Sequence, residues 1–127
     1  MTIASTSTAA RAQQVALFAL GALILLQPLW HGWLAPPRTG APILAAALAT
    51  LPWLPVLLST LRNRRRGVLW GGALALFYFA HGVAVAWSGA GTDRLLALIE
   101  VALTLLLIVP PGAIAWRDRR ATRTTAR

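Results

Sequence analysis

The sequence predicts an all-α integral membrane protein, a bundle of four transmembrane helices with short loops and both termini in the cytoplasm. Three observations support this fold class. The composition is 57% hydrophobic and only 12% charged, so a soluble domain of this size would expose much apolar surface to water. Four apolar runs each approach the roughly 20 residues that cross a bilayer core of about 30 Å. The arginines also lie mostly on one side of these runs.

The transmembrane domain is predicted over residues 12–116, between a polar segment at residues 1–11 and a basic tail at residues 117–127. The polar segment is rich in Ser, Thr and Ala, and we expect it to be disordered or only loosely helical. A secretory signal peptide is the alternative for the first apolar run, but no small-x-small cleavage site closes it. The four spans are predicted at about residues 12–33, 41–61, 68–87 and 94–116.

Prolines are predicted to interrupt three of these spans, because proline lacks the amide donor that continues a helix. Gln27-Pro28 should kink the first span or cap it early. Leu51-Pro-Trp-Leu-Pro55 should interrupt the second span, either as a static kink or as a hinge that lines a cavity. Pro110-Pro111-Gly112 should bend or break the inner third of the fourth span.

The distribution of arginine predicts how the chain is threaded. The formal net charge is +9. Only Arg38 and Arg94 lie on the outer side if the N-terminus is cytoplasmic, so the positive-inside rule favours cytoplasmic termini. Nucleic-acid binding is not expected, because no folded basic domain remains outside the spans. The middle loop and the tail are instead expected to contact the lipid bilayer, including its anionic lipids, through Arg62, Arg64, Arg65, Arg66, Arg117, Arg119 and Arg120.

Four tryptophans are predicted to form an interfacial belt, because an amphipathic ring prefers the head-group level of the membrane. They are Trp30, Trp33, Trp87 and Trp116. His31 lies between the first two and is interpreted as a hydrated interfacial histidine. His31 and His81 could together ligate a haem axially, but nothing else marks a cofactor pocket, so we expect no cofactor and no metal.

Two ionisable residues, His81 and Glu100, lie inside the hairpin formed by the third and fourth spans. Such residues are costly in hydrocarbon, which makes them the most informative feature of the sequence. His81 is six residues before Trp87 and Glu100 is six residues after Arg94, so both should lie about 9 Å below the outer interface. With the residues that share their helix faces, the predicted polar seam comprises Tyr78, His81, Glu100 and Thr104.

Two interpretations of this seam remain open. It is either a proton or cation site or a hydrogen-bonded contact that fixes the register of the helices. Enzymatic catalysis is not expected, because no nucleophile–base pair is visible. Ser59 and Thr60 lie at the opposite membrane face from His81.

Three function hypotheses follow. The first is a non-enzymatic structural or accessory protein, acting as a homo-oligomer or within a larger membrane complex. The second is a small oligomeric proton-coupled transporter or channel that uses Glu100, and the third is a lipid- or quinone-handling enzyme. The first two differ in whether Glu100 faces a water-accessible cavity or a tightly packed helix interface.

The same hairpin resembles a known family. The residues concerned are Trp70, the string Leu76-Phe-Tyr-Phe-Ala-His-Gly82, and Leu98-Ile-Glu100 followed by an aliphatic run and a terminal arginine. They are similar to the family catalogued as domain of unknown function 2069, over roughly Trp30 to Arg120. Pro110-Pro111-Gly112 departs from the family, whose last helix usually runs on unbroken. The resemblance implies a small proteobacterial inner-membrane protein of this fold with no established activity.

Overall fold

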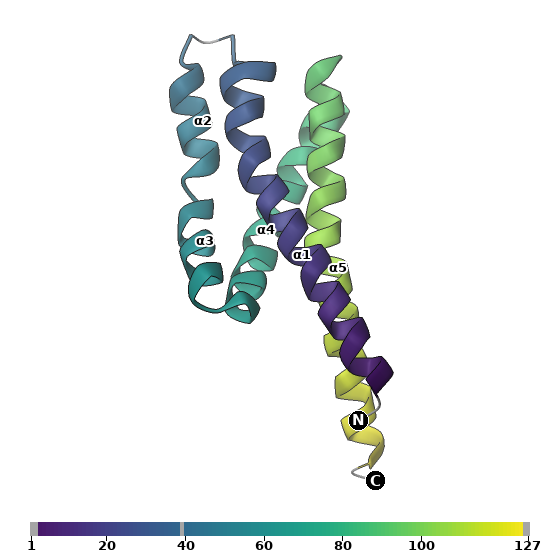
Figure 1. Ribbon diagram of the computed structural model, residues 1–127. Helices are drawn as coiled ribbons and strands as arrows, with labels where there is room; N and C mark the ends of the chain where they lie inside the picture. Colours follow the sequence, from purple (N-terminus) through teal and green to yellow (C-terminus); the bar gives the residue numbers. More distant parts are fainter. Residues whose placement is uncertain (1–2, 39, 126–127) are drawn as a thin grey trace.

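The computed structural model describes residues 3–38 and 40–125, and it is built from helices connected by short turns. The described residues contain no strand, which confirms the predicted all-α class. The described ends of the first and last helices lie at the same end of the bundle (Figure 1). In chain order the elements are α1 (Ile3–Leu29), the π-helical turn η1 (Trp30–Leu34), α2 (Pro42–Thr50), α3 (Trp53–Arg62), α4 (Arg64–Ser88) and α5 (Thr92–Thr125).

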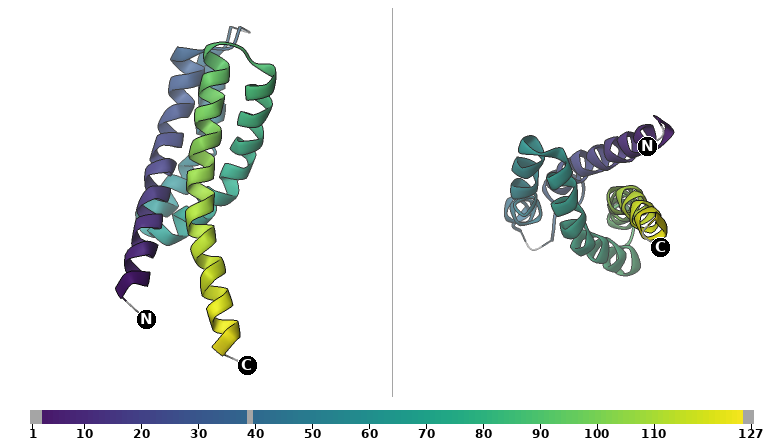
Figure 2. Two further views of the ribbon diagram at one scale, coloured as in Figure 1. Left: turned by 90° about the vertical axis from the view of Figure 1, so that its right-hand side faces the viewer. Right: turned by 90° about the horizontal axis from the view of Figure 1, so that it is seen from below.

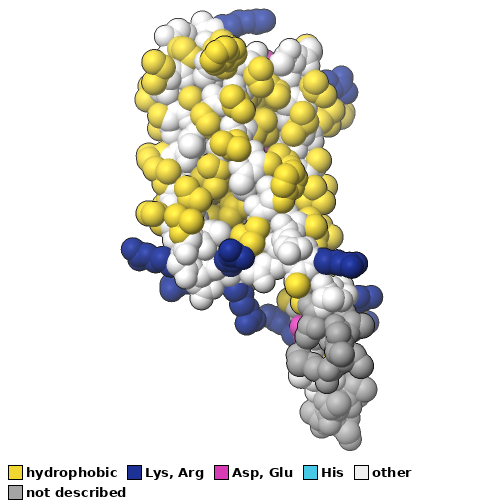
Figure 3. All heavy atoms as spheres, viewed as in Figure 1, with side chains coloured by type: hydrophobic (Ala, Val, Ile, Leu, Met, Phe, Trp, Pro, Cys, Tyr) yellow, Lys and Arg dark blue, Asp and Glu magenta, His cyan; other side chains and the backbone are white. Residues whose placement is uncertain are grey.

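Four helical stretches of the described residues are long and apolar enough to cross a membrane. Hydrophobic side chains cover the middle of the molecule, and arginine side chains gather along the lower edge of that apolar band (Figure 3). This is the separation of apolar and charged surface that a hydrocarbon slab with polar faces requires. The four stretches are Ser7–Leu34, Pro42–Arg62, Arg64–Ser88 and Thr92–Arg123.

The first and last helices, α1 and α5, are longer than the sequence predicted. The N-terminal segment, predicted to be disordered or only loosely helical, is helical from residue 3 onward, because α1 already begins at Ile3. The basic tail is likewise helical as far as Thr125, so that α5 has 34 residues. At 1.5 Å per residue this helix is about 51 Å long, well beyond the hydrocarbon thickness of about 30 Å. The ends of α1 and α5 therefore project past the α3–α4 connection (Figures 1 and 2).

The prolines have three different outcomes. Pro28 does not cap the first span early, because α1 continues into η1 and closes with a bond from Ala35 N to Trp30 O of 2.9 Å. Pro52 does interrupt the second span, which is divided into α2 and α3 as predicted. At residues 110–112, where the sequence predicts a bend or a break, the span does not break, since α5 is continuous through them. A helix that breaks within lipid leaves backbone N–H and C=O groups without hydrogen-bond partners. A π-helical turn or an unbroken helix keeps most of these groups hydrogen-bonded.

The predicted basic loop at residues 62–66 is reduced to one residue. Arg62 ends α3 and Arg64 begins α4, with the extended Asn63 between them. The Asn63 side chain caps α4 by accepting a bond from the Arg66 backbone N–H at 3.2 Å. A side-chain atom at Gly67 would overlap Thr60, so glycine lets α4 begin against α3 without a longer loop.

The buried residues form two apolar clusters at different levels of the bundle. The first includes Leu23 of α1 and Leu107 of α5, and the second includes Trp30 of η1 and Ala97 of α5. Helices α1, α4 and α5 form most of this core, whereas no residue of α2 is buried. The buried polar side chains of the described residues lie between the two clusters, and they are Gln27, Glu100 and Thr104.

Candidate functional site

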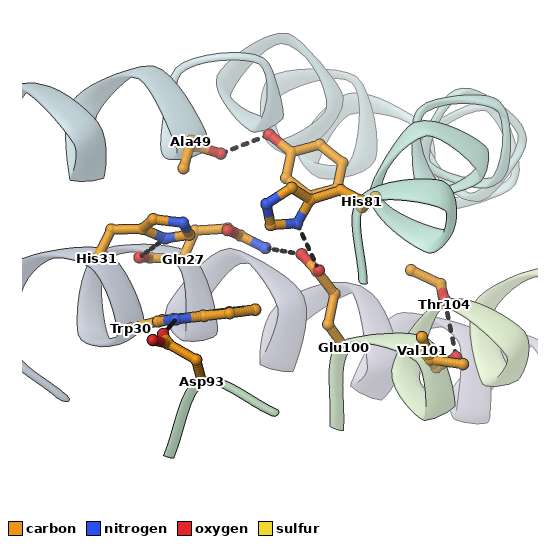
Figure 4. A network of polar contacts seen from close by, with 10 residues as sticks. Gln27, Trp30, His31, Ala49, His81, Asp93, Glu100, Val101 and Thr104 are labelled. Carbon is orange, nitrogen blue, oxygen red and sulfur yellow. Dashed lines mark hydrogen bonds and ion pairs between the residues drawn. The ribbon is translucent and has the colours of Figure 1, made fainter. Parts of the chain in front are cut away.

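A hydrogen-bonded cluster around Glu100 joins three helices. The Glu100 side chain, on α5, is fully buried. Gln27 Nε2, on α1, donates to Glu100 Oε1 at 2.6 Å, and His81 Nδ1, on α4, donates to Glu100 Oε2 at 2.9 Å (Figure 4). Each carboxylate oxygen is therefore bonded by a different helix. We call Gln27, His81 and Glu100 the Glu100 clamp.

Gly82 lets α4 approach the carboxylate closely. An added Cβ at Gly82 would lie 3.0 Å from Glu100 Oε2 and 3.1 Å from the backbone oxygen of Ala97. Both distances are tighter than ordinary van der Waals contact. The small residue next to His81 therefore brings the two helix backbones near enough for the short bond between His81 and Glu100.

The clamp is exposed on one side only, through His81. Its side chain is 43% exposed, whereas that of Glu100 is 0% exposed. The His81 ring borders a groove of about 470 Å³ between α1, the α2–α3 segment and α4. The residues that line this groove are Gln27, His31, Ala49, Pro52, Leu74, Phe77, Tyr78 and His81.

Trp30 and His31 lie beside the clamp. Trp30, one of the four tryptophans predicted for the interfacial belt, is only 2% exposed, so its ring faces the interior of the bundle. Its ring can be buried because its Nε1 donates to Asp93 Oδ1 at 3.0 Å, at the start of α5. The His31 ring stacks on Trp30 with centroids 5.0 Å apart, and it lies 6.1 Å from the His81 ring. The structure thus places His31 beside the Glu100 clamp, where its side chain is half-buried. The sequence predicted a hydrated interfacial residue.

The four residues of the predicted seam do not form one network. His81 and Glu100 meet as described above, but the other two bond elsewhere. The Tyr78 hydroxyl donates to the backbone oxygen of Ala49 on α2. The Thr104 hydroxyl donates to the backbone oxygen of Val101 within its own helix, at 2.8 Å. A hydroxyl that is satisfied by a nearby carbonyl has no need of a charged partner, so Tyr78 and Thr104 are separate from the clamp.

Gln27 is the member of the clamp that sequence reasoning missed. From the sequence, Gln27-Pro28 is interpreted only as a helix interruption. The available signal was an amide side chain within an apolar span, which needs a partner in lipid just as a carboxylate does. Its Oε1 atom is buried and has no hydrogen-bond partner.

The residues predicted at the membrane faces are exposed, apart from Trp30. Trp33, Trp87 and Trp116 are 82%, 92% and 55% exposed. The Arg120 guanidinium lies 3.7 Å from the centroid of the Trp116 ring, a cation–π contact. Arg62 and Arg66 line a second depression of about 620 Å³ between α3 and α4. All seven arginines predicted to contact lipid are exposed.

Within residues 3–38 and 40–125, no group of three or more His, Asp, Glu or Cys side chains is placed to hold a metal ion. The two histidines instead use their Nδ1 atoms within the protein. His31 Nδ1 donates to the backbone oxygen of Gln27 at 3.1 Å, and His81 Nδ1 bonds Glu100. The arrangement can therefore hold helices together and offer two imidazole Nε2 atoms to the groove.

Comparison with known proteins gives one match. A family model described as "Predicted membrane protein (DUF2069)" matches residues 15–116. No curated protein and no solved structure matches the chain. The matched region includes all three residues of the Glu100 clamp, and the four stretches of membrane-spanning length agree with the family's description. The chain therefore belongs to the family of membrane proteins known as domain of unknown function 2069.

Proposed function

We propose that the protein is a non-enzymatic membrane component, structural or accessory in role, in which the Glu100 clamp fixes α1, α4 and α5 in one arrangement. The observation that carries this proposal is the environment of Glu100. Its side chain has no exposed surface, and both carboxylate oxygens are bonded by side chains of neighbouring helices. A carboxylate that carries protons or cations has to reach water during its cycle, whereas a structural contact is best served by full burial and complete hydrogen bonding.

The structural role and the proton-coupled alternative predict opposite results in reconstituted vesicles. We expect vesicles that contain the protein, under an imposed pH gradient and membrane potential, to lose the gradient no faster than vesicles that contain the Glu100→Gln variant. A pH-sensitive dye inside the vesicles measures the rate. A wild-type flux well above that of empty vesicles, abolished in Glu100→Gln, would contradict the structural role and support transport.

We further propose that the protein lies in the bacterial inner membrane with both termini in the cytoplasm. The support is the excess of arginine at the end of the bundle where α1 begins and α5 ends. A reporter that is active only outside the cytoplasm should be silent when fused after Arg127 and active when inserted at Gly89. The reverse pattern would overturn this orientation.

The surroundings that fit such a component are anionic lipids and a larger assembly. The exposed arginines near the α3–α4 connection each favour anionic head groups by on the order of 1 kcal/mol. In the stretch Pro42–Arg62 only Trp53 and Val56 are buried within one chain, which leaves most of its surface for lipid, a second copy or another membrane protein.

A further inference from the structure

The groove beside the clamp has a polar end and an apolar end. His31 and His81 line its polar end, and Leu74 and Phe77 line it one to two turns farther along α4 from the α4–α5 connection, on the side where Pro52 also contributes. Along α4, the seven residue steps from Leu74 to His81 span about 10 Å. The polar end faces the connection at residues 89–91, so the groove is oriented like a membrane amphiphile with its head toward that side. Its volume of about 470 Å³ is within the range of roughly 300 to 1,000 Å³ typical of small-molecule sites.

The hydrogen bonds of His31 fix which of its ring nitrogens carries a proton. Its Nδ1 lies 3.1 Å from the backbone oxygen of Gln27. A carbonyl oxygen can only accept, so the proton of the neutral ring is on Nδ1. The Nε2 atom is then a hydrogen-bond acceptor, and none of the described residues bonds it.

The rest of the polar end contains a further unpaired acceptor. Gln27 Oε1 is buried next to these rings without a partner. His81 uses Nδ1 to bond Glu100, which leaves its Nε2 for the groove. In Figure 4 the Gln27 amide lies between the His31 ring and the Glu100 carboxylate, with the His81 ring beside them. A molecule that pairs with this end must therefore supply a hydrogen-bond donor for His31.

We propose that this groove binds a lipid alcohol, a hydrocarbon chain that ends in a hydroxyl head group. The hydroxyl donates to His31 Nε2, and the chain lies against Leu74, Phe77 and Pro52. A hydroxyl also pairs with His81 in either state of that ring, because it can accept from a protonated Nε2 or donate to a neutral one. An ether or an ester oxygen only accepts, so it cannot pair with His31.

A charged head group does not fit this end of the groove. No arginine lines the groove, and a protonated His81 already pairs its charge with Glu100, so a phosphate would lose its hydration without gaining a free cationic partner. An aliphatic chain, in contrast, finds a surface made mostly of apolar side chains. The inference goes beyond the proposed function and does not depend on it, because the clamp holds the helices whether or not the groove is occupied.

The test is photolabelling of the full-length protein in phosphatidylcholine nanodiscs. Two probes are compared: an eighteen-carbon alcohol with a diazirine in mid-chain, and its methyl ether, which differs only in lacking the donor. We expect the alcohol to label the peptide around Leu74 and Phe77 about five times more strongly than the ether, since one hydrogen bond contributes about 1 kcal/mol. Equal labelling by both probes, or labelling spread evenly over the lipid-exposed helix faces, would overturn the proposal.

Two variants and one control locate the site. His31→Leu should remove the preference for the alcohol, and the ratio of the two probes within one sample corrects for any loss of folded protein. Ala49→Phe should fill the groove and reduce labelling by the alcohol severalfold, whereas Ala47→Phe, on the exposed face of the same helix, should not. If Ala49→Phe instead dissociates a dimer and leaves labelling unchanged, the groove is occupied by a second copy of the chain and the proposal is wrong.

Discussion

Replacing Glu100 with leucine is expected to lower the free energy of unfolding by about 1 to 3 kcal/mol, because the buried Gln27 amide and His81 Nδ1 both lose their acceptor. The effect is measured by steric trapping in lipid bicelles, which reports the free energy of unfolding of a membrane protein directly. Leucine fills a similar volume, so the loss is not explained by a cavity. A leucine variant as stable as the wild type would mean that the clamp contributes nothing to the fold.

Glu100→Gln is the matched control for this prediction. Its side-chain oxygen can still accept from Gln27. Its amide N–H can donate to His81 Nδ1 once the imidazole adopts the other tautomer. We therefore expect this variant to unfold within about 0.5 kcal/mol of the wild type, in contrast to the leucine variant.

Gly82→Val is expected to destabilise the protein by about 1 to 3 kcal/mol through overpacking. Its Cβ alone would lie 3.0 Å from Glu100 Oε2 and Val101 Cγ2, and 3.1 Å from the Ala97 backbone oxygen. The backbone oxygen cannot rotate away, so α4 and α5 have to separate and the His81–Glu100 bond of 2.9 Å has to lengthen.

The matched control is Gly72→Val on the same helix. No atom lies within 4 Å of an added Cβ there, so it should be neutral or slightly stabilising, since valine favours a helix more than glycine does. Thermal unfolding in mild detergent compares the two variants with the wild type. Equal effects at the two positions would show that helix propensity, and not the close approach at Gly82, determines the result.

The sequence was sufficient for the fold class because the length and spacing of apolar runs depend on the bilayer thickness and hardly on tertiary contacts. It also placed His81 and Glu100 at one depth, since each lies six residues from an interfacial residue on its own span. The same count applied to Gln27, which lies six residues before Trp33, puts the amide at that depth too. The third member of the clamp could therefore have been predicted.

Other features depend on contacts that no local pattern contains. The indole of Trp30 fits an interfacial belt by type and by position, but Asp93 accepts its N–H from another helix and allows burial. Tyr78 lies on the same face of α4 as His81, yet its hydroxyl bonds Ala49 because α2 passes beside it. The continuity of α5 through Pro110 and Pro111 likewise reflects the cost of unbonded backbone in lipid, which outweighs the local preference of proline.

The most direct measurement of the Glu100 clamp is the coupling free energy between Gln27 and Glu100. It requires the free energies of unfolding of the wild type, Gln27→Leu, Glu100→Leu and the double variant, all in the same lipid. In the double variant no Gln27 amide is left buried without an acceptor. Its decrease in the free energy of unfolding should therefore be smaller than the sum of the decreases in the two single variants, by about 1 kcal/mol or more. Losses that add to within about 0.3 kcal/mol would contradict the clamp, because residues that do not interact behave in that way.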